Sequence, residues 1–244
     1  MRFLLLLGAV LGILLNKVQA TKASLSSQPL ILEPTTSYDL KKNGVRWTFQ
    51  AKGWKRWLPA NGGPLGSVTL DLVRNGVILH PYIGKNALES AWVGDCTWVY
   101  RADFDVTNLL GDSKFMRYGH DLALVMSGVD TYGSLWLNGK RLISLGNPHR
   151  TYTVRLTSQA AQSTSQEPVL NSGPNTLEWV LEPPIQRVQR VAEQSALPLP
   201  GGLWLHSRKA AYQFGWDWAR AMPSVGLSGS VSLQIVGDPL IRRL

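Results

Sequence analysis

An alternation of apolar and polar residues limits what this 244-residue chain can fold into. Between residues 97 and 106 every even position is apolar, whereas Arg101, Asp103 and Asp105 occupy odd positions. Successive side chains of a strand point to opposite faces, so the pattern predicts a strand with one buried face. The same alternation recurs downstream, where the predicted inward-facing residues are Leu122, Leu124, Met126, Tyr152, Val154, Leu156, Leu177, Trp179, Leu181, Val231, Leu233 and Ile235.

Other segments extend this strand-rich pattern. Residues Val45–Phe49 and Val68–Val73 are predicted to be earlier strands, and Ser134–Leu137 is followed by Asn138-Gly139, a pair typical of a tight hairpin turn. Helical periodicity is weak and confined to Ile185–Gln194. Many short strands joined by Gly- and Pro-containing turns predict an all-β fold, either a β-sandwich or a jelly roll.

The beginning of the chain has the pattern of an export signal. Arg2 precedes an almost purely apolar run over residues 3–15, and small residues follow, so residues 1–20 are predicted to be a signal peptide. We expect residues 21–43 to be a lead-in segment and 44–244 to form the β-sandwich. The apolar run is too short for a stable membrane anchor. These features predict the secretory pathway, with a lysosomal or secreted destination.

The residues that commonly perform catalysis or bind metals form no recognisable constellation. Cys96 is the single cysteine, which excludes an internal disulfide and predicts a half-buried structural thiol. No phosphate-binding glycine loop or nucleophile motif is present. We therefore expect no cofactor, no metal and no self-contained active site. The histidines lack metal-ligand spacing and occur at positions 80, 120, 149 and 206.

The chain carries a formal net charge of +9, and its most basic stretch is Lys52-Gly53-Trp54-Lys55-Arg56-Trp57. Cations that alternate with aromatic rings are typical of a groove that stacks nucleic-acid bases. The same hexamer also suits Lys and Arg side chains that pack on Trp faces within one protein. Because the chain begins with an export signal, we expect no nucleic-acid partner.

The tripeptide Trp216-Asp217-Trp218 is the strongest candidate for a binding site. Two large rings offer faces for the C–H groups of a sugar, and a carboxylate accepts charge-assisted hydrogen bonds from its hydroxyls. In a strand the two rings would share one face, whereas a turn would allow all three side chains to converge. The alternative is that both tryptophans pack in the core and leave an exposed acid.

Several segments resemble β-mannosidases of glycoside hydrolase family 2, in that family's order and over roughly residues 40–240. The most distinctive is the Arg-Lys-Ala stretch that leads into Trp-Asp-Trp, followed by Pro-Ser and Gly-Leu. The segments that carry the resemblance are 208–218, Pro223-Ser224, Gly226-Leu227, Trp98–Phe104, Gly128–Thr131, Leu135–Gly139 and Pro148–Leu156.

The resemblance implies a galactose-binding-domain-like jelly-roll β-sandwich beside a separate catalytic barrel. It also implies that Trp216, Asp217 and Trp218 contact the terminal mannose of a glycan. Three features depart from the family pattern. Ala219-Arg220 and Ser228-Gly229 stand where the family has Gly-Pro and Trp-Lys, and the helix-bearing segment before Pro81-Tyr82 is expected to be contracted to Leu72–His80.

The chain is too short to hold both this sandwich and a (β/α)₈ barrel, which needs about 250 residues. It also lacks the Asn-Glu pair in which the family's acid/base carboxylate lies. We therefore expect the N-terminal carbohydrate-binding domain of a β-mannosidase-like glycosidase, with the catalytic barrel beyond this chain and no hydrolysis by the chain alone. The alternative is a free-standing, lectin-like module.

Overall fold

The computed structural model describes residues 37–41, 44–60, 66–107, 121–158, 169–171, 173–196 and 199–236. The chain divides into two units, residues 1–35 and 36–244, and every described residue belongs to the second. The predicted signal peptide, residues 1–20, and most of the lead-in segment, residues 21–43, lie outside the described residues.

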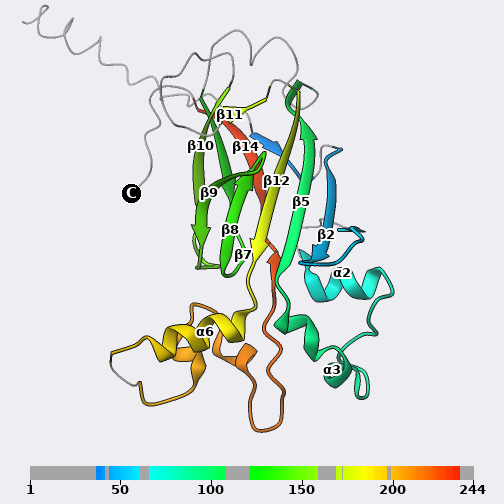
Figure 1. Cartoon of the computed structure of the whole chain (residues 1–244), viewed down its shortest axis with the longest axis vertical. Coiled ribbons are helices and arrows are strands. Elements are labelled where there is room, and N and C mark those ends of the chain that lie inside the picture. Colours follow the sequence, from blue (N-terminus) through cyan, green and yellow to red (C-terminus); the bar gives the residue numbers. More distant parts are fainter. Residues whose placement is uncertain are drawn as a thin grey trace, which may run out of the picture. The chain divides into compact units, whose positions relative to one another are not determined.

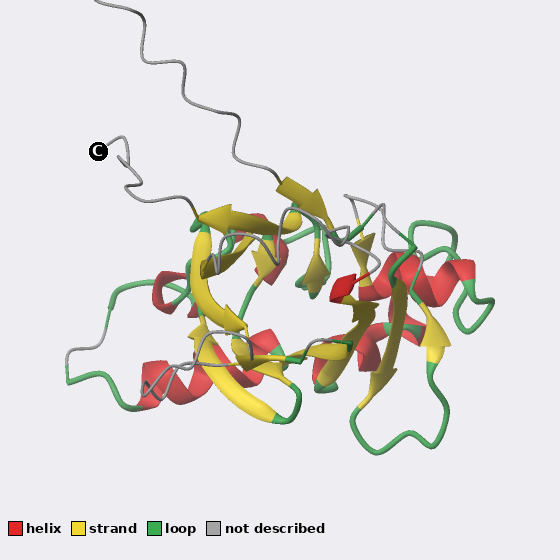
Figure 2. Cartoon of the chain, turned by 90° about the horizontal axis from the view of Figure 1, so that it is seen from above, coloured by secondary structure: helices red, strands yellow, loops and turns green. Residues whose placement is uncertain are grey.

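The described residues form mostly antiparallel β-sheet, and the predicted all-β sandwich is confirmed. Figures 1 and 2 show the two larger sheets as separate layers. The six-stranded sheet has the order β3 (Leu58–Pro59), β2 (Arg46–Ala51), β5 (Trp98–Asp105), β12 (Pro174–Leu181), β8 (Gly133–Leu137) and β9 (Lys140–Leu145). The five-stranded sheet has the order β1 (Ser37–Asp39), β14 (Val231–Val236), β6 (Asp121–Met126), β10 (Tyr152–Ser158) and β11 (Val169–Leu170). A three-stranded sheet has the order β4 (Gly66–Ser67), β13 (Gly226–Leu227) and β7 (Val129–Asp130).

The hydrophobic core lies between the two larger sheets, as the alternation predicts. Along β5 and β12 alternate residues are buried, and Trp98 and Trp179 are fully buried. The indole of Trp179 stacks on Trp47 at 5.3 Å between ring centroids, and its N–H points to the sulfur of Met126 in the opposite sheet at 3.4 Å. The polar residues of the alternation lie on the outer face, where Arg101 pairs with Glu178.

The predicted hairpin is present between β8 and β9. Asn138 and Gly139, the two residues of the turn, have φ angles of 50° and 79°. Two successive residues with positive φ match the twist of the flanking strands, and Asn and Gly adopt this conformation at the lowest cost. The Asn138 side chain also accepts a hydrogen bond from the backbone N–H of Thr176 on β12 (2.9 Å), which ties the turn to the neighbouring strand.

The prediction of a strand at Val68–Val73 is wrong, because this segment forms helix α2 (Val68–Arg74). The hydroxyl of Ser67 caps the helix by accepting a hydrogen bond from the N–H of Leu70 (3.3 Å). Val68 and Leu72, four residues apart, lie on one face of the helix and are fully buried. A run of six residues is too short for periodicity to separate a helix from a strand, and here the cap decides.

Helix α2 begins at Val68, four residues before the start of Leu72–His80, the segment to which the family's helix-bearing segment was expected to be contracted. Asp71 on the buried face accepts a hydrogen bond from the hydroxyl of Tyr100 (2.8 Å). Burial, followed in size by the charge of Asp71, raises the pKa of Tyr100 well above 10. This contact fastens the helix to the centre of the six-stranded sheet.

The helices gather at one end of the sheets (Figure 1). The weak helical pattern at Ile185–Gln194 is confirmed, and Pro183 and Pro184 stand at the start of the helix, where proline is tolerated. The segment before β13, drawn in orange, forms a long loop at this same end (Figure 1). In the described residues the helical elements are α2, α3 (Asn86–Glu89), η1 (Ala91–Asp95), α6 (Pro184–Glu193), η2 (Leu203–His206) and η3 (Ala211–Phe214).

Candidate functional site

The tripeptide singled out in the sequence lies in a tight, exposed turn. The backbone N–H of Trp216 donates to the carbonyl of Ala219 (2.8 Å), and the N–H of Ala219 donates back to the carbonyl of Trp216 (3.1 Å). Asp217 and Trp218 therefore occupy the two central positions of the turn. The Trp216 and Trp218 side chains are 67% and 85% exposed. The alternative in which both rings pack in the core is wrong.

Gly215 sets the direction in which the chain enters this turn. Its φ angle of +92° lies in a region that L side chains rarely adopt. A Cβ atom at this position would lie 2.9 Å from the backbone nitrogen of Ala221 and 3.0 Å from the carbonyl oxygen of Ala219. The chain segments that enter and leave the turn thus approach so closely that position 215 requires glycine.

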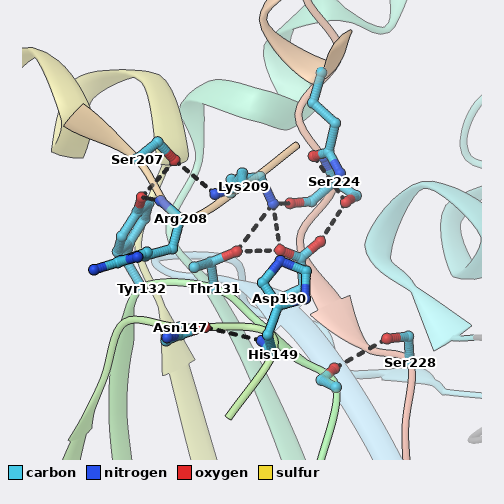
Figure 3. A network of polar contacts seen from close by, with 12 residues as sticks. Asp130, Thr131, Tyr132, Asn147, His149, Ser207, Arg208, Lys209, Ser224 and Ser228 are labelled. Atoms are coloured by element: carbon cyan, nitrogen blue, oxygen red, sulfur yellow. Dashed lines mark hydrogen bonds and ion pairs between the residues drawn. The ribbon is translucent and has the colours of Figure 1, made fainter. Parts of the chain in front are cut away.

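A buried lysine lies at the base of the loop that carries the tripeptide, which spans residues 210–223 (Figure 3). The Lys209 side chain is fully buried, and its ammonium group forms an ion pair with Asp130 of β7. It also donates to the hydroxyl of Thr131 (3.0 Å) and to the carbonyl of Ser224 (2.7 Å). Burial lowers the pKa of Lys209, and the charge of Asp130 opposes this shift. A buried cation of this kind requires both its counter-ion and its hydrogen bonds.

Asp130 binds both ends of the loop at once. Its Oδ1 atom pairs with Lys209, which precedes the loop, while Oδ2 accepts a hydrogen bond from the hydroxyl of Ser224, which follows it. The side-chain carbonyl of Gln213 accepts a hydrogen bond from the backbone N–H of Ser224 (3.0 Å). The network extends to Ser207, whose hydroxyl lies 2.7 Å from that of Tyr132.

Asp130 and Lys209 are functional candidates that sequence reasoning missed. Both belong to segments that carry the family resemblance, yet no role was predicted for either. Their ion pair joins positions 79 residues apart, and nothing in the local pattern around Lys209 indicates a buried side chain. Lysine is almost never fully buried without a partner, so the signal lies in the pairing, which the sequence does not show.

The basic hexamer does not form a stacking groove. Trp54 packs edge-on against Trp98 at 5.5 Å and joins the core, and the guanidinium of Arg101 covers Trp57 at 4.1 Å from the ring centroid. The interpretation in which cations pack on Trp faces therefore holds for Trp57, although the cation comes from β5. Lys52, Lys55 and Arg56 are exposed.

Cys96 and the histidines are the remaining candidates from the sequence. Cys96 is a free, half-buried thiol, as predicted, and burial followed in size by Asp95 raises its pKa. His120 lies outside the described residues. Within the described ranges, no three His, Cys, Asp or Glu side chains form a group suited to a metal ion. No helix in the described part of the chain is both long and apolar enough to cross a membrane.

Comparison with known proteins identifies the fold and the relatives. Residues 47–229 match the family described as glycosyl hydrolase 2 galactose-binding domain-like. The chain is 30% identical to β-mannosidase A of Aspergillus terreus over 211 residues, which cover 85% of this chain and 21% of that enzyme. It is 29% identical to β-mannosidase B of Thermothelomyces thermophilus, covering 78% and 21%. The chain thus spans about a fifth of the length of these relatives.

Comparison with solved structures also identifies a β-mannosidase as a relative. The β-mannosidase of Dictyoglomus thermophilum matches with a TM-score of 0.67 and 31% identity, covering 82% of this chain and 22% of that one. An exo-chitosanase of Amycolatopsis orientalis, at 17% identity and a TM-score of 0.53, shares the fold. The chain therefore belongs to the glycosyl hydrolase 2 galactose-binding domain-like family and corresponds to the N-terminal domain of the β-mannosidases of that family.

Proposed function

We propose that this chain is the sugar-contacting domain of a β-mannosidase and that Trp216, Asp217 and Trp218 bind the terminal mannose of a glycan. The observation that carries the proposal is the tight turn in which Trp216, Asp217 and Trp218, two indoles that flank an acid in the sequence, are all exposed. The turn lies inside the region that matches the family. Aromatic faces and a charged acceptor suit the alternating C–H and hydroxyl groups of a sugar.

Hydrolysis itself is assigned to a catalytic barrel outside this chain. A retaining glycosidase needs two carboxylates about 5 Å apart. The relatives named β-mannosidases are roughly five times as long as the region that this chain covers. Large apolar side chains are exposed on the helical segments near the turn, which supports docking of a further domain at this end. They include Tyr212, Trp204 and Leu205.

The experiment that tests the proposal is replacement of Asp217 by alanine. Loss of a charge-assisted hydrogen bond is expected to weaken binding of a β-mannoside by about 1–3 kcal/mol, which is roughly 5- to 150-fold. Titration calorimetry with mannobiose measures the affinity, and release of free mannose, expected to be absent, measures hydrolysis. Glu193→Ala is the matched control, because Glu193 is an exposed acid at the end of α6. Equal affinities of the Asp217→Ala variant and the unmodified chain would refute the assigned role.

We also propose that the chain enters the secretory pathway and reaches a lysosome or the medium. The support is the sequence of residues 1–20, with its cation, apolar run and small residues at the end. When the chain is expressed in a secreting eukaryotic cell, the product is expected to begin at Thr21, as measured by N-terminal sequencing. A cytosolic product that retains Met1 would contradict the proposal.

A further inference from the structure

We infer that Asp130 and Lys209 are positioning residues that hold the sugar-facing turn in place without touching the sugar. The loop over residues 210–223 carries the turn, and the residues on either side of it, Lys209 and Ser224, both bind Asp130. One carboxylate therefore closes the loop at its base (Figure 3). The consequence for sugar binding rests on the function proposed above, whereas the consequence for loop geometry does not.

Asp130, the residue that joins the two ends of the loop, belongs to a β-strand whose neighbouring residues are buried. Strand β7 pairs antiparallel with β13, and Asp130 stands directly opposite Gly226. Val129 and Leu227, the other pair of this short ladder, are both buried. Asp130 is thus fixed by backbone hydrogen bonds and by packed neighbours, so it provides a rigid point to which the two ends of the loop are fastened.

The hydrogen bonding of Lys209 excludes a direct chemical role. A lysine ammonium group has three N–H donors. In Lys209 these point to Asp130, to the hydroxyl of Thr131 and to the carbonyl of Ser224. With its side chain fully buried and all three donors used, Lys209 has no free donor to offer a ligand. Its contribution to binding is therefore to fix the backbone on either side of the turn.

Two further contacts carry this constraint from the base to the tip of the loop. Halfway along, Gln213 receives hydrogen bonds from the backbone N–H groups of Met222 and Ser224, both at 3.0 Å. At the tip, Trp216 and Ala219 exchange backbone hydrogen bonds. The two arms of the loop are thus joined at three successive levels. Loss of the contacts of Asp130 at the base is expected to weaken the hydrogen bonds at Gln213 and at the tip.

Hydrogen exchange of the full chain tests the inference without any sugar. In Lys209→Met and in Asp130→Asn, amides of residues 210–222 should exchange about tenfold faster than in the unmodified chain. The matched control is Asp103→Asn, because Asp103 forms an ion pair with Arg46 on the outer face of the large sheet. The control should leave exchange of the loop unchanged, and all variants should leave β5 and β12 protected.

Two further variants keep the test decisive if Lys209→Met or Asp130→Asn alone prevents folding. Ser224→Ala removes one hydroxyl from the closure and leaves the ion pair intact, so it should fold and raise loop exchange about two- to fivefold. The double variant Asp130→Asn/Lys209→Met removes both charges and avoids a buried, unpaired ion. It should fold more readily than Lys209→Met or Asp130→Asn and still show fast loop exchange.

The outcomes separate this inference from the proposed function. Loop exchange that stays unchanged in Ser224→Ala and in the double variant would overturn the inference. Fast loop exchange together with mannobiose affinity lowered about fivefold or more supports it. Fast loop exchange with unaltered affinity would confirm the control of loop geometry. If Asp217→Ala also leaves the affinity unaltered, the proposed function fails while the positioning role remains.

Discussion

Replacement of Asp130 by alanine is expected to lower the free energy of unfolding by about 3–5 kcal/mol at neutral pH. The substitution leaves the ammonium group of Lys209 buried without its counter-ion. It also removes the acceptor for the hydroxyl of Ser224. The loss exceeds that of an ordinary hydrogen bond because a buried, uncompensated charge bears the full cost of desolvation. Urea denaturation followed by far-ultraviolet circular dichroism measures the change.

The pH dependence of this variant provides a second check. Burial lowers the pKa of Lys209, and removal of Asp130 takes away the charge that opposes this shift. The folded pKa then lies further below the pKa in the unfolded chain, so the unfolded chain binds more protons between the two values. Stability of the variant therefore rises with pH in that window, and its deficit relative to the unmodified chain should shrink as the pH rises from neutral toward the ordinary pKa of a lysine.

An exposed ion pair supplies the control for both measurements. Asp103 pairs with Arg46 at 3.0 Å, and the Arg46 side chain is 76% exposed. Asp103→Ala is expected to cost about 1 kcal/mol or less, because water and salt screen such pairs. A cost for Asp130→Ala as small as that of the control, or a deficit that stays constant with pH, would show that the Lys209 charge is not held by Asp130.

Much of the fold was predictable because its central strands have one buried and one exposed face. In β5 and β12 the alternation extends over eight residues, which is long enough to distinguish strand from helix. The segment that became α2 has seven residues, of which five are Val, Thr or Leu. There one deciding signal is local, the cap by the hydroxyl of Ser67, which periodicity does not register. The other is the burial of Val68 with Leu72, which depends on tertiary packing.

The candidate site was predictable in part for a similar reason. Trp216-Asp217-Trp218 is conspicuous in the sequence because aromatic rings flank an acid, but the sequence leaves open whether the rings are buried. The structure decides this through the turn and the exposure of both indoles. The closure by Asp130 and Lys209 joins distant segments, so it follows from the topology of β7 and β13 and from no local pattern.

The ten tryptophans of the chain divide into groups with different roles. Trp47, Trp98 and Trp179 are buried in the core, whereas Trp216 and Trp218 are exposed. The indole of Trp98 donates a hydrogen bond to the carbonyl of Val93 (2.9 Å) and contacts the ring of Phe49. Tryptophan is therefore abundant both in the core and on the exposed turn, and only the second group belongs to the proposed sugar-binding site.

Replacement of a buried tryptophan and of an exposed one should change the free energy of unfolding by very different amounts. Trp98→Ala should lower the free energy of unfolding by about 3–5 kcal/mol, because it opens a cavity in the core and leaves the carbonyl of Val93 without its donor. Trp218→Ala, which replaces the same residue type at 85% exposure, should change stability by less than about 0.5 kcal/mol. Urea denaturation of the two variants measures both values.

The same pair of variants separates folding from recognition. If the proposed function holds, Trp218→Ala should weaken mannobiose binding while it leaves the fold intact, because the exposed ring would offer a face to the sugar and contributes little to the core. A loss of stability in Trp218→Ala comparable to that in Trp98→Ala would show that the turn packs against the domain in solution. The exposed indole would then be a structural contact, and Asp217 would lose the aromatic partner on which its proposed role depends.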